Sequence, residues 1–137
     1  MKRVLVADDS MTARMFILRC LEIVLDEDTE YFEAANGEES LQILKKESID
    51  LVVTDLNMPV MDGFVLLRRL KASPKLIETP VIIITSLKNE ARKQELLDLG
   101  ALAVLGKPAS PPQLAEIVDN LFIKTGTEDN QGDKDDR

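Results

Sequence analysis

Residues 51–63 read LVVTDLNMPVMDG, and this stretch decides the fold that we expect for the rest of the chain. Residues 51–54 form a short apolar run, which is typical of a strand buried on both faces of a sheet. Asp55 follows the run directly. In the loop after it, Pro59 stiffens the turn and Gly63 supplies backbone freedom. A buried strand is therefore expected to end in a carboxylate and a tight loop.

Similar apolar runs lie at residues 4–7, 31–35, 81–84 and 102–105. Segments with helical spacing of apolar residues follow the five runs, at 11–25, 38–47, 63–72, 90–99 and 113–123. Strands that alternate with helices predict a parallel sheet with helices on both faces. We therefore expect an α/β fold of the (βα)5 type, a flavodoxin-like three-layer sandwich with strand order 2-1-3-4-5.

Local signals mark several of these boundaries. Ser10 is placed to cap the first helix, Gly100 follows the fourth, and Pro111 is placed to start the fifth. Residues 126–137 read GTEDNQGDKDDR, without an apolar side chain. Such a stretch cannot offset the entropy lost on ordering. We expect one domain over residues 1–124, followed by a disordered polar tail over residues 125–137.

Composition excludes several classes of function. The formal net charge of −8 opposes binding to nucleic acid or to an anionic membrane. The chain has no histidine, which removes histidine-based triads and histidine-ligated metals. The single cysteine, Cys20, cannot form an internal disulfide or a zinc cluster and is expected to be a small buried side chain. No apolar run approaches the ~20 residues of a membrane span, and the N-terminus lacks the pattern of a signal peptide, so we expect a cytoplasmic protein.

Polar side chains follow four of the five expected strands. Asp8 and Asp9 come after the first, Asp55 after the third, Thr85 after the fourth, and Lys107 just beyond the fifth. The carboxyl ends of parallel strands share one edge of the sheet, where open α/β sheets bind ligands. We therefore expect these five side chains to converge.

Three carboxylates that meet at one edge repel one another unless a counter-charge is present. Oxygen ligands without histidine or cysteine suit a hard divalent ion, and Mg²⁺ is the expected cofactor. Asp55 is also a possible nucleophile toward phosphorus, with the Thr85 hydroxyl and Lys107 placed to contact phosphoryl oxygens. The Asn57 carbonyl would be within reach of the metal.

Each signal alone also fits a structural role. A pair of acids after a strand is common at a helix N-terminus, where it favours the helix dipole. Asp62 fits a turn residue, and Glu38 and Glu39 fit first-turn helix acids. The convergence of five positions on one edge favours the functional interpretation.

The motifs VLVADDS (4–10), VVTDLNMPVMDG (52–63), IIITS (82–86) and LGKP (105–108) resemble those of receiver domains of two-component response regulators, in particular the free-standing chemotaxis type. The resemblance covers residue 1 to about residue 124. It implies a phospho-acceptor at Asp55, a direct metal ligand at Asp9, a ligand through a metal-bound water at Asp8, a carbonyl ligand at Asn57, a switch hydroxyl at Thr85, a phosphoryl contact at Lys107 and a cis peptide between Lys107 and Pro108.

The resemblance also implies partners. The phosphoryl donor would be a histidine kinase or a phosphotransfer protein, and the output would pass through contacts with a target protein that the sequence does not identify. We expect a monomer or a weak dimer that catalyses only its own phosphorylation and dephosphorylation. One position departs from the family habit: Val104 stands where many members carry Tyr or Phe, and a valine cannot signal by swinging a ring.

Two other functions stay open on the sequence. The first is a Mg²⁺-dependent phosphohydrolase with an aspartyl-phosphate intermediate, but such enzymes place an acid two residues after the nucleophile, where this chain has Asn57. The second is a receiver-like adaptor that works without phosphorylation. Loss of Asp55 or Lys107 would be its expected mark, and both are present.

Overall fold

The computed structural model describes residues 1–86 and 89–126. Over these residues five strands and five helices alternate, and their bounds differ from the expected ones by three residues or fewer. The elements are β1 (Arg3–Ala7), α1 (Met11–Val24), β2 (Glu30–Ala34), α2 (Gly37–Lys46), β3 (Leu51–Asp55), α3 (Gly63–Lys71), β4 (Val81–Thr85), α4 (Glu90–Leu99), β5 (Ala103–Gly106) and α5 (Pro111–Gly126).

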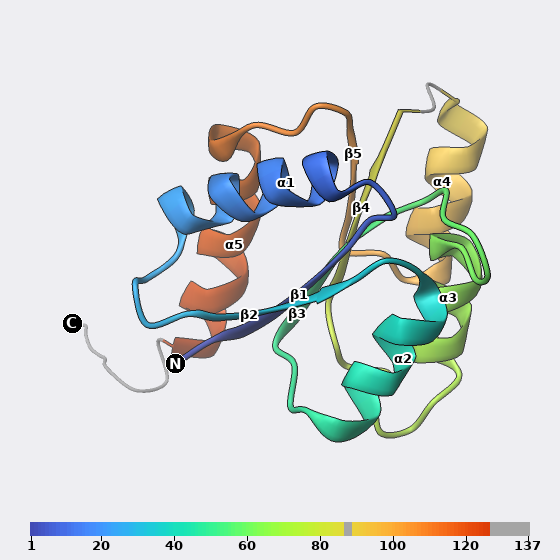
Figure 1. The fold of residues 1–137 in the computed structure, drawn as a ribbon, viewed down its shortest axis with the longest axis horizontal. Coiled ribbons are helices and arrows are strands. Elements are labelled where there is room, and N and C mark those ends of the chain that lie inside the picture. Colours follow the sequence, from blue (N-terminus) through green and yellow to red (C-terminus); the bar gives the residue numbers. More distant parts are fainter. Residues whose placement is uncertain (87–88, 127–137) are drawn as a thin grey trace.

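The strands form one parallel sheet in the order β2-β1-β3-β4-β5, which confirms the predicted topology. Helices α1 and α5 cover one face of the sheet, and α2, α3 and α4 cover the other (Figure 1). Each face of the sheet therefore packs against its own layer of helices and has its own apolar cluster. Cys20 is buried in the cluster beneath α1 and α5, as predicted.

The central strands are buried, but the edge strands are not. Every residue of β3 and β4 is buried, and so is every residue of β1 after Arg3. The prediction that all five strands are buried on both faces is wrong for β2 and β5, where exposed and half-buried residues occur. These two strands pair on one side only and lie where the helical layers end.

The predicted helix signals are present. The Ser10 side chain accepts a hydrogen bond from the Ala13 N–H, and Gly100 ends α4 with a left-handed φ of 117°. Helix α5 starts at Pro111 and is described to Gly126; the rest of the predicted tail, 127–137, lies outside the described residues. Asp62 is the N-cap of α3, where its side chain accepts from the Val65 N–H. Within the described part of the chain, no helix is both long and apolar enough to cross a membrane.

The turn between β3 and α3 brings the start of the helix against the end of the strand. The Gly63 N–H donates to the Leu56 carbonyl oxygen at 2.8 Å. A Cβ added at Gly63 would lie 2.4 Å from the carbonyl oxygen of Asp55, which is far inside van der Waals contact. Only glycine fits here without displacing the backbone that carries Asp55.

We therefore expect Gly63→Ala to lower the free energy of unfolding by about 1–3 kcal/mol, because the added methyl group must displace backbone. Gly106→Ala is the matched control, since a Cβ there would meet no atom within 4 Å. The control should change stability by less than about 0.5 kcal/mol. Urea denaturation of the three proteins measures both values, and equal losses for the two variants would contradict the close approach.

Candidate functional site

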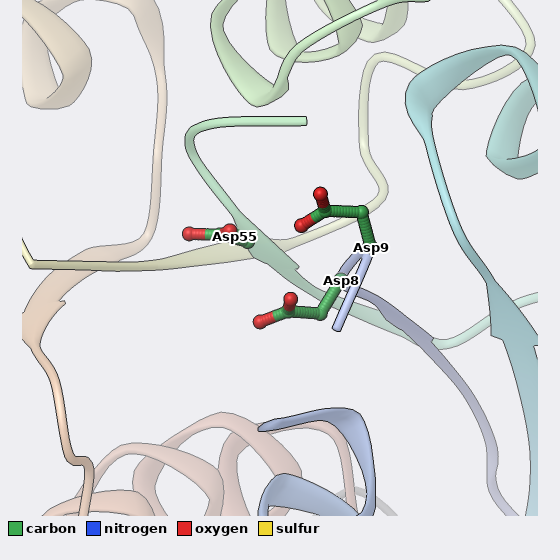
Figure 2. Close-up of side chains that lie close together, drawn as sticks. All are labelled: Asp8, Asp9 and Asp55. Atoms are coloured by element: carbon green, nitrogen blue, oxygen red, sulfur yellow. The ribbon is translucent and has the colours of Figure 1, made fainter. Parts of the chain in front are cut away.

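Three carboxylates meet at the carboxyl ends of β1 and β3. Asp8 and Asp9 follow β1, and Asp55 is the last residue of β3, the strand beside it. One oxygen from each carboxylate lies within 4.8 Å of the others, and the three side chains face a common space (Figure 2). Asp8 is fully buried, Asp55 is 5% exposed, and Asp9 is exposed. The predicted convergence of these acids is present in the structure.

Lys107 brings a positive charge to this cluster. Its Nζ donates to Asp8 Oδ2 at 3.1 Å and lies 3.3 Å from Asp55 Oδ1. The Lys107 N–H donates to the Thr85 carbonyl oxygen at 2.9 Å, which places the residue at the end of the β4–β5 pairing. The peptide between Lys107 and Pro108 is cis, as the family resemblance implied. Lys107 follows β5, which lies on the side of β4 opposite to β3, and its ammonium reaches the two buried acids from there.

Backbone N–H groups hold the two buried carboxylates. Asp8 Oδ1 accepts from the Ser10 N–H at 2.9 Å, and Asp55 Oδ1 accepts from the Leu56 N–H at 2.8 Å. The ammonium of Lys107 approaches the same Oδ1 of Asp55. Among the described residues, Oδ2 of Asp55 accepts no hydrogen bond. This oxygen is the one placed to bind a ligand or to attack one.

Burial and the neighbouring charges act on Asp55 in opposite directions. Burial raises the pKa of the Asp55 carboxyl, the negative charge of Asp8 raises it further, and Lys107 and the Leu56 N–H only partly offset these effects. Burial lowers the pKa of Lys107, but its hydrogen bonds and ion pairs with Asp8 and Asp55 outweigh this, so the net shift is upward. The Asp55 charge is thus costly in the metal-free fold, while Lys107 stays protonated at neutral pH.

The donor set fits a hard divalent cation. Carboxylate oxygens are the ligands that Mg²⁺ prefers, and three carboxylates beside one ammonium leave an excess of negative charge. A cation that enters between them relieves repulsion that Lys107 does not cancel. Asn57 lies on the exposed loop two residues after Asp55, and its role as a carbonyl ligand stays a prediction.

Thr85 and Val104 line a cavity at the end of β4 and β5. Thr85, the last residue of β4, is 4% exposed, and Val104 on β5 is 9% exposed. Both line an open cavity of about 280 Å³, together with Leu96 and Arg92 of α4. Val104 thus lines a space between β5 and α4, next to the predicted switch hydroxyl.

Among the described residues, the side chain of Arg14 contacts the cluster, and sequence reasoning missed it. Its Nη1 donates to the carbonyl oxygen of Asp8 at 2.7 Å, and its Nε pairs with Glu33 Oε1 at 2.8 Å. The available signal was its position in the first turn of the helix that follows Asp8 and Asp9. The partner, Glu33, lies near the end of β2, and a contact between a helix and an edge strand has no local sequence pattern.

In the metal-free protein we expect Asp55→Asn to raise stability at about pH 7. Because the folded pKa of Asp55 is raised, its favourable contribution is present below the unfolded pKa and is lost as pH rises through the folded pKa. Thermal melts in EDTA should show a higher midpoint for Asp55→Asn at about pH 7 and no gain at about pH 3. Asp119→Asn, an exposed acid on α5, is the control and should change little. A lower midpoint for Asp55→Asn at neutral pH would contradict the electrostatic account.

Comparisons with known proteins agree with this geometry. Residues 4–119 match the family model described as the response regulator receiver domain. The chain is 41% identical over 120 residues to the gliding motility regulatory protein of Myxococcus xanthus, which covers 87% of this chain and 15% of that protein. It is 34% identical over 123 residues to the chemotaxis protein CheY-3 of Vibrio cholerae, which covers 88% of this chain and 91% of that protein.

The solved structures point the same way. The chemotaxis response regulator CheY4 of Vibrio cholerae has a TM-score of 0.76 to this chain at 31% identity, and the match covers 88% of this chain and 98% of that one. The chain thus spans a small part of one relative and nearly all of others. Motifs, strand order, family model and structural neighbours agree, and the chain belongs to the response regulator receiver domain family of two-component signalling, with the CheY-like flavodoxin fold.

Proposed function

We propose that this chain is a single-domain response regulator that accepts a phosphoryl group on Asp55 in a Mg²⁺-dependent reaction. The donor is a histidine kinase or a phosphotransfer protein, and the phosphorylated form signals through protein contacts. One observation carries the proposal: Asp55 is buried at a strand end, with Lys107 at 3.3 Å and the Asp8 and Asp9 carboxylates within 4.8 Å. CheY-3, which this chain covers to 91%, is a relative of similar length, whereas the gliding motility regulatory protein is much longer and is covered to 15%.

The domain bounds, the location in the cell and the oligomeric state are part of what we propose. The receiver domain covers residues 1–124 and the last turn of α5 to Gly126, and the remaining residues to 137 form a polar tail outside it. The protein acts in the cytoplasm as a monomer or weak dimer, does not bind nucleic acid or membranes, and does not turn over an external substrate. The net charge of −8 supports the exclusion of nucleic acid and anionic membranes.

In the proposed reaction, Asp55 Oδ2 forms a bond to phosphorus while the bond between phosphorus and the donor nitrogen breaks. The ammonium of Lys107, already between Asp8 and Asp55, contacts a phosphoryl oxygen, and the Thr85 hydroxyl donates to another. When bound, Mg²⁺ supplies positive charge for the phosphoryl oxygens, held by Asp8, Asp9, Asp55 and the Asn57 carbonyl. The chain positions these groups and neutralises their charge.

The two alternative functions are disfavoured by particular residues. A phosphohydrolase needs an acid two residues after the nucleophile, and Asn57 occupies that position. An adaptor that works without phosphorylation has no need of a lysine bridging two buried acids, and Lys107 does so here. Turnover of a chromogenic phosphate ester would favour the phosphohydrolase.

Incubation with acetyl phosphate and Mg²⁺ should add one phosphoryl group to the chain. Asp55→Asn should abolish the adduct, because no other acid in the cluster lies at the end of β3 with a free oxygen toward the site. Asp98→Asn, an exposed acid on α4, is the matched control and should be modified like the wild type. Intact-protein mass spectrometry measures the adduct, and an undiminished adduct on Asp55→Asn would refute the assignment.

The output of this receiver is proposed to pass through α4. The guanidinium of Arg92 on α4 lies 4.3 Å from the ring centroid of Phe64, the residue after Gly63 on α3. Arg92 also lines the cavity beside Thr85 and Val104. The first turn of α4 contacts α3 through this cation–π interaction. A movement of Thr85 toward a phosphoryl group therefore changes the surroundings of α4 directly. Part of the loop between Thr85 and α4, residues 87–88, lies outside the described residues.

Beryllofluoride, a phosphoryl mimic, should shift the amide resonances of Ser86, of the N-cap Asn89 and of α4 (Glu90–Leu99). The change over β5 should be modest because Val104 has no ring to swing. Asp55→Asn treated in the same way is the control and should show no shifts. Two-dimensional amide NMR measures these responses. Shifts confined to α1, with residues 86–99 silent, would overturn the proposed output route.

A further inference from the structure

We infer that Arg14 is a positioning residue of the metal site: it fixes the peptide that joins Asp8 to Asp9 and thereby sets the affinity of the site for Mg²⁺. The inference rests on the proposed Mg²⁺ site and goes beyond it. Arg14 takes no part in phosphoryl transfer and is not itself a metal ligand. Its effect passes through the backbone of the two acids.

The guanidinium of Arg14 is held at two points. Its Nη1 donates to the Asp8 carbonyl oxygen at 2.7 Å, and its Nε pairs with Glu33 Oε1 on β2 at 2.8 Å. The side chain is 15% exposed. A planar guanidinium bonded through two of its nitrogens has a fixed orientation, and the carbonyl group that it binds is fixed with it.

The bonded carbonyl is part of the peptide plane that leads into Asp9. Asp8 itself is well held, because its N–H donates to the Ala34 carbonyl and its carboxylate accepts from the Ser10 N–H and from Lys107. In contrast, the exposed carboxylate of Asp9 makes no hydrogen bond or ion pair within the described part of the chain. The backbone of Asp9 is thus held on both sides, by Arg14 at the preceding peptide and by the Ser10 N–H at the following one, and Arg14 is the side chain that fixes the preceding peptide.

A positioning role and a simple charge effect predict opposite signs. Arg14 is a cation close to a cluster that binds a cation. If only its charge mattered, its removal would relieve repulsion and tighten Mg²⁺ binding. If it positions the Asp8–Asp9 peptide, its removal weakens binding. The sign of the change therefore identifies the role.

Isothermal titration calorimetry of the full chain, freed of metal, with MgCl₂ as the titrant tests this. Arg14→Gln should weaken Mg²⁺ binding roughly tenfold, the scale typical of residues that orient metal ligands. Arg19→Gln removes the same charge from an exposed position of the same helix and should leave the affinity equal or slightly tighter. The double variant Arg14→Gln/Glu33→Gln keeps the net charge and should still bind more weakly than the wild type.

Thermal melts in EDTA check that each variant is folded. If Arg14→Gln does not fold, Arg14→Lys decides the matter, because lysine keeps the charge but cannot bond both partners from a rigid plane; it too should bind Mg²⁺ more weakly. Wild-type affinity or tighter binding in a folded Arg14 variant overturns the inference and leaves the proposed function standing. Absence of Mg²⁺ binding by the wild type overturns both.

Discussion

The site depends on repulsion among three carboxylates that the sheet holds together, with Lys107 too weak a counter-charge to cancel it. Asp8 and Asp55 come close together, with carboxylate oxygens within 4.8 Å, because β1 and β3 are neighbours and both strands end at the same level. Their burial removes the water that would otherwise screen them, so the pKa of Asp55 rises. This arrangement favours the binding of a cation, because the cation relieves the repulsion. Under the proposed function, a phosphoryl group then bonds to Oδ2 of Asp55, which accepts no hydrogen bond among the described residues.

The surrounding structure prevents the acids from relaxing apart. Gly63 lets α3 begin against the carbonyl of Asp55, the Ser10 N–H holds one oxygen of Asp8, and Arg14 holds the carbonyl of the same residue. Most of the groups that hold the acids in place belong to the backbone, and the backbone cannot move without disturbing the buried strands. The repulsion is therefore retained as a driving force for ligand binding. The same rigidity makes the turn after β3 and the start of α1 the places where a small substitution should act on the site.

Much of the fold and of the site was predictable because the relevant signals are local. Short apolar runs that end in Asp8, Asp55 and Thr85 specify parallel strands and the edge at which their polar ends meet. Burial of the edge strands was predicted wrongly, because apolar composition does not reveal which strands lack a neighbour. Contacts such as Arg14 with Glu33 and Arg92 with Phe64 join separate elements, and no periodicity in the sequence specifies them. The cavity beside Val104 depends on how β5 and α4 pack, and it could likewise not be predicted from the sequence.

The most direct test of this account is the titration of the Asp55 carboxyl group, followed by carbon-13 NMR with and without Mg²⁺. In EDTA the group should titrate above the ordinary range of an aspartate, because it is buried beside Asp8. Saturating Mg²⁺ should lower its apparent pKa, since the cation favours the charged form. An ordinary pKa in EDTA that does not move when Mg²⁺ is added would contradict the claim that uncompensated charge governs the site.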